Sequence, residues 1–249
     1  MSDQIFKNLN DQRILPYTWV LDRLHSCLKP RTYFEIGTQT GQTLALANCS
    51  SLAIDPDFVV EHNIIKKKSV CTFYQDTSDN FFRDASPVQF LGGTVDIAFL
   101  DGMHWYEYLL RDFYHTEAFC RPNSIIAMHD CIPPDSFVGR RISGDDRLRA
   151  ETQFPDWWAG DVWKTLIILL NTRPDLKIIC LDAPPTGIVL VTNLDPNRQD
   201  WRRDYHQQIE EVRSLDLETY GIENLRAKID VQSTSLLETD EGLSSLFWL

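Results

Sequence analysis

Short apolar runs alternate along the chain with segments that have helical spacing. Seven runs predict strands, at Tyr33–Ile36, Ser51–Ile54, Val70–Tyr74, Val95–Leu100, Ser124–Met128, Lys177–Leu181 and Ile188–Thr192. Between the fourth and fifth runs, apolar side chains recur every four residues over 105–120, which predicts a helix. Strands that alternate with helices favour an α/β fold, in which a mostly parallel sheet carries helices on both faces.

The two ends of the chain have helical patterns of their own. An apolar stripe over 17–28 predicts a helix that covers the sheet, within an N-terminal segment of residues 1–30. Residues 195–249 hold 12 acidic and six basic side chains, with apolar residues at helical spacing, and predict an acidic helical extension. The main domain is therefore expected over residues 31–194.

Two connections in this domain are informative. The last two strands are joined by residues 182–187, a link too short for a parallel crossover, so these strands should pair antiparallel. Residues 131–161 follow the fifth strand and are rich in Pro, Asp, Arg and Trp. A connection of this length in a compact domain usually forms a lid or a substrate wall. At its end, Asp161 is expected to cap the next helix.

Composition excludes several classes of protein. The formal net charge of −12 leaves no general basic footprint for nucleic acid. No apolar run is long enough to span a membrane. The six cysteines are scattered without a C-x-x-C motif, and the first ten residues lack the apolar core of a signal peptide. Free thiols in a reducing cytoplasm are expected.

A glycine turn directly follows the first predicted strand. Residues 35–41 read E-x-G-x-x-x-G, and a helix-like run follows at 44–48. Glycine permits a close ligand approach, and a helix start would offer free N–H groups. The spacing is neither the G-x-G-x-x-G of dinucleotide folds nor that of a P-loop. The pattern predicts a nucleotide-type ligand at this turn.

Five consecutive strands each end in or near an acidic residue: Glu35, Asp55, Asp76, Asp101 and Asp130. Carboxyl ends of parallel strands share one edge of a sheet, so these groups should line one site. Asp55 lies 18 residues after Gly37, a position that suits a ribose diol. The structural alternatives are an Asp-Pro turn for Asp55 and a helix N-cap for Asp76.

Two further motifs extend the pattern: Asp101-Gly102-Met103-His104 after the fourth strand, and His129-Asp130 after the fifth. With residues 160–164 and 185–187, they resemble class I S-adenosylmethionine (SAM) methyltransferases. The branch in question includes small bacterial enzymes and metal-dependent sugar O-methyltransferases. The resemblance covers roughly residues 30–192 and implies a Rossmann-like sheet of seven strands with the last one antiparallel.

The resemblance implies a role for each motif residue. The cofactor would be bound by Glu35, Gly37, Thr38, Gly41, Gln42, Asp55, Asp76, Ser78 and Asp101. His104 would be the general base, and Asp101 would stand at the junction of cofactor and metal. Asp101 and Asp130 would ligate Mg²⁺ or Mn²⁺. His129 stands where the metal-dependent relatives usually have an acid, so its imidazole would suit manganese, iron or zinc better than magnesium, or would pack without ligating.

The acceptor stays open at this stage. A hydroxyl on a small molecule or glycan fits best, and N-methylation is an alternative. Trp157 and Trp158 would stack on the acceptor or pack the lid, while Arg140, Arg141 and Lys164 would meet an anionic group or stay solvated. Structurally, His104 would cap the next helix, and Asp130 would form a turn.

Two other functions remain for this sequence. One is a SAM-binding or partner-binding module without catalysis. The other is a nucleotide- or NAD-dependent oxidoreductase, which the glycine spacing disfavours. The apolar C-terminal residues 246–249 must be buried, on the domain or in a homo-oligomer.

Overall fold

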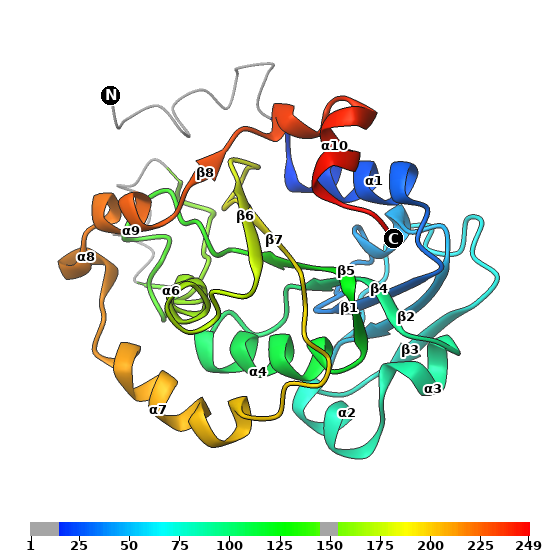
Figure 1. Ribbon diagram of the computed structural model, residues 1–249, viewed down its shortest axis with the longest axis horizontal. Coiled ribbons are helices and arrows are strands. Elements are labelled where there is room, and N and C mark those ends of the chain that lie inside the picture. The colour runs from blue at the N-terminus through cyan, green and yellow to red at the C-terminus, as the bar shows by residue number, and fades with distance from the viewer. Residues whose placement is uncertain (1–14, 145–153) are drawn as a thin grey trace.

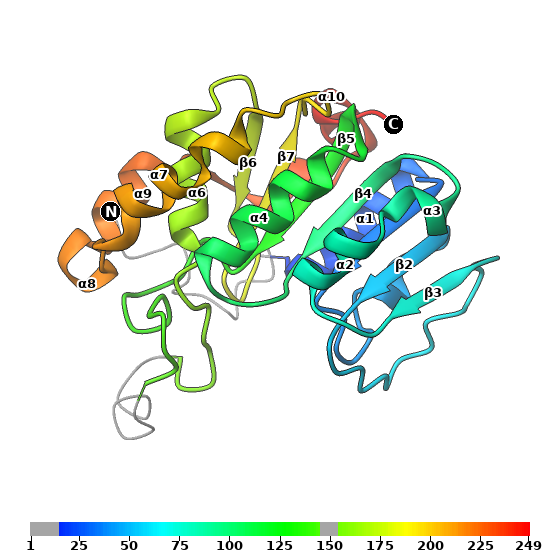
Figure 2. The ribbon, with the colours of Figure 1, turned by 90° about the horizontal axis from the view of Figure 1, so that it is seen from below.

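A computed structural model describes residues 15–144 and 154–249. Its described part is built on an eight-stranded sheet in the order β3-β2-β1-β4-β5-β7-β6-β8 (Figures 1 and 2). The strands are β1 Thr32–Ile36, β2 Ser50–Ile54, β3 Cys71–Tyr74, β4 Val95–Leu100, β5 Cys120–His129, β6 Lys177–Leu181, β7 Ile188–Thr192 and β8 Val231–Gln232.

The sheet confirms the predicted Rossmann-like arrangement. Strands β1 to β5 pair in parallel, and β7 lies antiparallel between β5 and β6. The acidic extension adds β8, which pairs in parallel with β6 and makes the sheet one strand wider than expected. This strand has only two residues, both half-buried, so it left no periodic signal in the sequence.

Helices cover both faces of the sheet. They are α1 Tyr17–Leu28, α2 Ser78–Asp84, α3 Pro87–Leu91, α4 Tyr106–Glu117, α6 Trp163–Thr172, α7 Trp201–Arg213, α8 Leu217–Tyr220, α9 Ile222–Lys228 and α10 Asp240–Leu246, with 3₁₀ turns η1 Leu44–Leu46 and η2 Thr234–Leu237. Figure 1 shows α1 and α10 on one side of the sheet and α2, α3 and α4 on the other. Every residue of β1 and β4 is buried, and alternate side chains enter two separate cores.

The C-terminal extension packs against the N-terminal helix. Arg23 of α1 donates hydrogen bonds to the Leu237 carbonyl (2.8 Å) and to Asp240 (2.6 Å). Phe247 is buried beneath this contact, while Trp248 is 65% exposed. Most of the apolar C-terminus is therefore covered by the domain itself.

Two properties of the described chain bear on its setting. None of the described helices combines the length and apolar character needed to cross a membrane. All six cysteines carry free thiols, three of them buried.

The helix expected at 44–48 is wrong. Only the short 3₁₀ turn η1 forms there, and the chain then enters β2 at Ser50. The buried ammonium of Lys68 donates to the carbonyl oxygens of Leu44 (2.7 Å), Ala47 (2.5 Å) and Ile64 (2.8 Å). This cation satisfies the carbonyls that would otherwise need the next helical turn, so a tertiary contact replaces local helix formation.

The expected N-cap role of Asp161 is also wrong. The N-cap of α6 is Val162, without a side-chain hydrogen bond. The Asp161 carboxylate instead accepts the Tyr106 N–H (3.2 Å) in the first turn of α4. An orphan N–H of one helix is therefore satisfied from the start of another. This contact joins the 131–161 connection to the D-G-x-H motif.

Candidate active site

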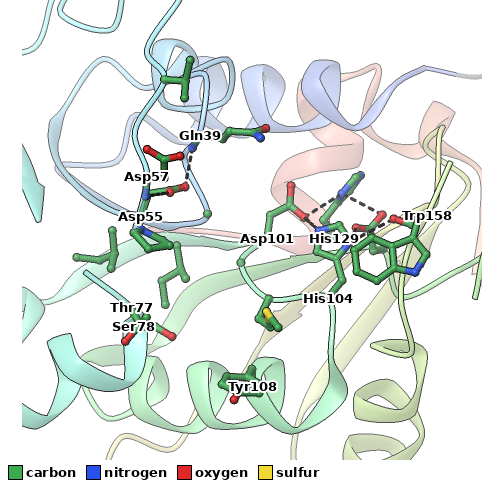
Figure 3. A pocket seen from close by; sticks show the side chains of 18 of the residues that line it. Gln39, Asp55, Asp57, Thr77, Ser78, Asp101, His104, Tyr108, His129 and Trp158 are labelled. Carbon is green, nitrogen blue, oxygen red and sulfur yellow. Dashed lines mark hydrogen bonds and ion pairs between the residues drawn. The ribbon is translucent and has the colours of Figure 1, made fainter. Parts of the chain in front are cut away.

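A cavity of about 600 Å³ opens at the carboxyl ends of the parallel strands. Figure 3 shows its two halves, with Asp55, Thr77 and Ser78 on one side and His104 and Trp158 on the other. Asp101 lies between the halves. Four of the five strand-end carboxylates, those of Asp55, Asp76, Asp101 and Asp130, therefore line one cavity as predicted, whereas Glu35 lies outside the lining.

The glycine turn lets two strand ends approach closely. Gly37 has a φ of +86°, and a Cβ at this position would lie 2.0 Å from the carbonyl oxygen of Asp101. Only glycine tolerates both the backbone angle and the contact. The Asp101 N–H donates to Ile36 (2.9 Å), so the turn is held directly against the D-G-x-H segment.

Asp55 is oriented by the backbone around it. Its two carboxylate oxygens accept the N–H groups of Gln39 (2.7 Å) and Asp57 (2.8 Å). Each oxygen keeps a second lone pair for a ligand hydroxyl in the cavity. The exposed Asp57 also lines the cavity and was missed, because an acid in a polar turn carries no distinguishing pattern.

The wall after β3 holds Asp76 and Ser78. One Asp76 oxygen accepts the Asn80 side-chain amide and the Thr77 N–H (both 2.7 Å), and these bonds lower the pKa of Asp76. Thr77 is the N-cap of α2 and accepts the Asn80 N–H (3.3 Å). The cap is thus made by Thr77, which leaves the second oxygen of Asp76 without a described partner.

Four expected cofactor residues lie outside the cavity lining: Glu35, Thr38, Gly41 and Gln42. Glu35 is fully buried behind the glycine turn and accepts a hydrogen bond from Tyr33. Burial raises the pKa of Glu35 to about 7, against the opposing effect of the neighbouring Tyr33, Thr38 and Thr43 hydroxyls. Gly41 is buried, and Gln42 is exposed. The structure places these residues around the base of the turn.

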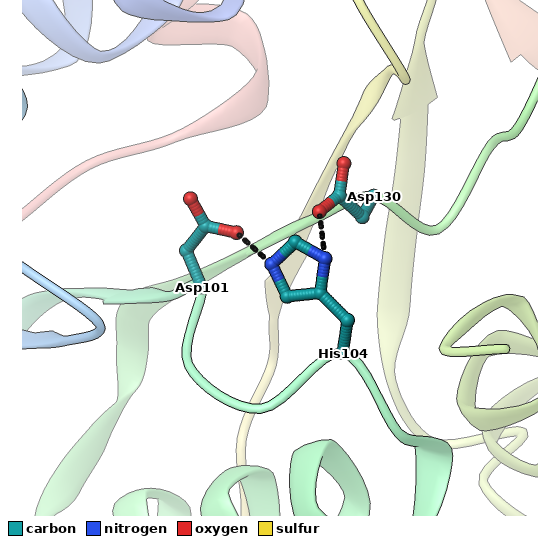
Figure 4. Close-up of side chains that lie close together, drawn as sticks. All are labelled: Asp101, His104 and Asp130. Atoms are coloured by element: carbon teal, nitrogen blue, oxygen red, sulfur yellow. Dashed lines mark ion pairs between the residues drawn. The ribbon is translucent and has the colours of Figure 1, made fainter. Parts of the chain in front are cut away.

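His104 lies among three oxygen acceptors, of which Figure 4 shows Asp101 and Asp130. Its Nδ1 is 3.2 Å from Asp130 Oδ2 and 3.2 Å from the carbonyl oxygen of Trp158. A carbonyl and a carboxylate only accept, so the network assigns the proton to Nδ1. Nε2, 3.7 Å from Asp101 Oδ1, then carries the lone pair. The side chain does not cap α4, whose N-cap is Trp105.

His129 bridges the two aspartates. Its Nδ1 lies 3.3 Å from an oxygen of Asp101 and 3.3 Å from an oxygen of Asp130. Burial alone would lower its pKa, but the two carboxylates outweigh burial and raise the pKa well above its usual value. Its ring packs on Tyr17 of α1 at 4.1 Å, a contact that the sequence gave no sign of. The imidazolium therefore offsets the negative charge of the two strand ends.

Asp130 has both carboxylate oxygens engaged. Oδ1 accepts from the Thr186 hydroxyl and faces His129, while Oδ2 faces His104. Burial would raise the pKa of Asp130, but the adjacent His129 and His104 hold it below its usual range. The residue also has a left-handed φ of 63°. Such a conformation in a non-glycine residue marks a constrained site.

Three side chains of the site offer donor atoms for a divalent metal. Donor atoms of Asp101, His104 and Asp130 lie within 4.8 Å of one another and could hold an ion. In this arrangement, however, both oxygens of Asp130 already have partners, and Nδ1 of His104 is a donor. Nδ1 of His129 also lies between the same carboxylates. The described contacts are therefore those of a His–Asp pair.

The cationic candidates of the 131–164 region point elsewhere. Arg141 pairs with Glu107 (2.9 Å) and Asp161 (3.0 Å). Arg140 pairs with Glu218, and the buried Lys164 pairs with Asp161. None of the three lines the cavity, whereas Trp157 and Trp158 do. Of the residues predicted to contact the acceptor, only the two tryptophans line the cavity.

Two solved structures illustrate what this chain is similar to in fold. An O-methyltransferase from Bacillus cereus in complex with SAH is 12% identical, with 70% of this chain and 79% of that chain covered and a TM-score of 0.45. A putative caffeoyl-CoA O-methyltransferase from Staphylococcus aureus is 11% identical, with 70% and 81% covered and a TM-score of 0.47. Likenesses of this size carry no functional argument.

Sequence comparison is more direct. A search of curated proteins finds no match. Residues 34–131 match a family model described as a methyltransferase domain. The matched range includes the glycine turn, Asp55, the D-G-x-H motif and Asp130. This match and the strand order agree with the resemblance drawn from the motifs. Residues 34–131 of this chain therefore resemble a methyltransferase domain, within a Rossmann-like sheet.

Proposed function

We propose that this protein is a SAM-dependent O-methyltransferase that acts on a hydroxyl of a small molecule or glycan. The observation that carries the proposal is the position of His104. Its Nδ1 is held by Asp130 and the Trp158 carbonyl, and the residue lines the same cavity as the glycine turn and Asp55. A base with a free Nε2 thus shares one cavity with a nucleotide-type binding wall.

The cofactor half suits SAM on two observations. Gly37 lines the cavity and lets the turn lie directly against the Asp101 backbone, and the fixed carboxylate of Asp55 offers lone pairs to a ribose diol. Asp76 and Ser78 line the wall where the resemblance places the adenine. SAM supplies an electrophilic methyl group when bound. The chain therefore needs only to orient and deprotonate a nucleophile.

The acceptor half supplies the proton transfer. Nε2 of His104 would take the proton of the acceptor hydroxyl, and bound SAM would supply the methyl group to that oxygen. Asp130 then stabilises the imidazolium through Nδ1, as the orienting carboxylate does in other His–Asp pairs. We propose that this step needs no divalent metal, because His129 already bridges Asp101 and Asp130.

The lining also favours an acceptor without negative charge. Asp156 lines the acceptor half beside two tryptophans and has no described partner, and among the described residues no Lys or Arg lines the cavity. Arg111, near the lining Asp79, is held by that carboxylate at 2.8 and 2.6 Å. Among the described residues, a carboxylate or phosphate on the acceptor would find no cation to compensate its desolvation. We therefore propose neutral or amine-bearing hydroxyl acceptors.

The test measures SAH release from SAM in EDTA, with matched phenols and sugars that carry an amine, a neutral group or a carboxylate. We expect methylation of neutral and amine-bearing members, at rates about tenfold or more above the carboxylates. Preference for the carboxylates would contradict the acceptor class. SAM binding without methylation of any member would favour the alternative of a non-catalytic SAM-binding module.

A further inference from the structure

We infer that residues 157–161, here called the strap, are a positioning device that fixes the tautomer of His104; this rests on the proposed role of His104 as base. The Trp158 carbonyl lies 3.2 Å from Nδ1, and its indole stacks on the imidazole at 5.1 Å with a 21° interplanar angle. One residue of the strap therefore contacts both the edge and the face of the base (Figure 3).

The strap also holds the main chain of His104. The Asp161 N–H donates to the His104 carbonyl (3.2 Å), and the Asp161 carboxylate accepts the Tyr106 N–H (3.2 Å). Gly160, directly before Asp161, has a φ of +65°, and a Cβ at this position would lie 1.8 Å from the His104 carbonyl oxygen. Backbone contact at this distance is open to glycine alone.

The strap is in turn anchored on its far side. The Ala159 N–H donates to the Val138 carbonyl (2.9 Å), and the Trp158 indole N–H donates to the Arg140 carbonyl (2.8 Å). The Asp161 carboxylate is paired with Arg141 and Lys164 and is 2% exposed. Because both sides are fixed, the strap can hold His104 against rotation and does not merely follow it.

Fixing the tautomer matters for a general base. A neutral imidazole carries its proton on either nitrogen, and only the Nδ1–H form leaves Nε2 free to accept a proton. The strap adds a second acceptor at Nδ1 beside Asp130. Trp157 and Trp158 also line the cavity, so the segment that faces the acceptor also fixes the tautomer of His104. Gly160 is the residue on which this contact depends.

The test compares Gly160→Ala with Gly92→Ala. Gly92 has a similar φ of +68°, but a Cβ there meets nothing within 4 Å, so the control carries the same backbone strain without the clash. Long-range ¹H–¹⁵N spectra of ¹⁵N-histidine protein at pH 8 report the protonated nitrogen, and His104→Ala assigns the signal. Wild type and Gly92→Ala should show Nδ1–H. Gly160→Ala should show a mixed or Nε2–H form while its SAH affinity stays within about twofold.

Turnover, once an acceptor is found, should fall about tenfold or more in Gly160→Ala through kcat. Should that variant fail to fold, Trp158→Ala, which keeps the carbonyl but removes the stack and the Arg140 anchor, should shift the tautomer in the same direction. A pure Nδ1–H signal in whichever variant folds would overturn the inference. Absence of SAH binding by wild type would instead overturn the proposed function, and the tautomer result would stand apart from it.

Discussion

The cofactor half and the acceptor half of the cavity are built from contacts of different range. Asp55 is fixed by N–H groups of Gln39 and Asp57, which lie 16 and two residues away. His104 is fixed by Trp158, 54 residues away, and Asp130 by Thr186, 56 residues away. The position of Asp55 is set by contacts close to it in the sequence. The position of His104 is set by segments that are distant in the sequence and pack over it.

Substitutions in the two halves of the cavity should have different effects. A substitution in the cofactor half should act on SAM affinity, because its groups contact the nucleotide wall. A substitution in the acceptor half should leave SAM affinity intact and act on turnover, since its groups orient the base. Separate effects on binding and rate would therefore sharpen the distinction, and mixed effects would break it.

The largest effect is expected from His104→Ala. Loss of the base should lower turnover by about 10²–10⁴-fold, the usual contribution of a positioned general base. The affinity for SAH should change little, because Nε2 faces the acceptor half. Turnover is measured as SAH release, and affinity by calorimetry. Near-normal turnover would remove His104 from the chemistry.

Asp55→Ala should act in the opposite way. Removal of a carboxylate that accepts two ribose hydroxyls should weaken SAH binding by about 10–100-fold, from the energies of hydrogen bonds to charged groups. Asp57→Ala is the matched control, since Asp57 is exposed on the same turn and holds no described partner through its side chain. Stronger loss in the control than in Asp55→Ala would move the ribose contact to Asp57.

The smallest effect concerns Glu35, behind the glycine turn. Its pKa is raised from 4.5 to about 7, so the folded state binds this proton more tightly than the unfolded chain. This stabilisation is fully present below pH 4.5 and is lost as the pH rises through about 7. Glu35→Gln should remove that loss, by at most about 3 kcal/mol at pH 8.

Urea unfolding of wild type and Glu35→Gln at pH 4.5, 6 and 8 measures this effect, and the difference between the two proteins cancels other titrating groups. The gap in unfolding free energy should widen in favour of the variant as the pH rises. A gap that is constant with pH would mean that the buried carboxyl keeps an ordinary pKa.

The sequence predicted the cofactor half because its signals are local. Apolar runs located β1, β2, β4 and the antiparallel β6–β7 pair, and the strand-end acids other than Glu35 line one cavity. Residues whose position depends on a distant partner were placed wrongly or missed. Lys68 donates to the backbone carbonyls after the glycine turn, where the predicted helix does not form. The Asp161 carboxylate accepts an N–H group of α4 and does not cap α6.

The charge state of the site could not be predicted from the sequence either. His129 stood in the motif as a metal ligand or a packed side chain, and only the positions of Asp101 and Asp130 show that it bridges two carboxylates. Tyr17 reaches its ring from the N-terminal helix, 112 residues earlier in the chain. No periodicity or spacing encodes such a contact.

SAM is proposed to bind in this cavity without the help of a metal. Calorimetric titration of the purified protein with SAH, in EDTA and then with Mn²⁺, tests it most directly. The account predicts one binding site per chain with the same affinity under both conditions. No binding in either condition, or binding that appears only with Mn²⁺, would contradict it.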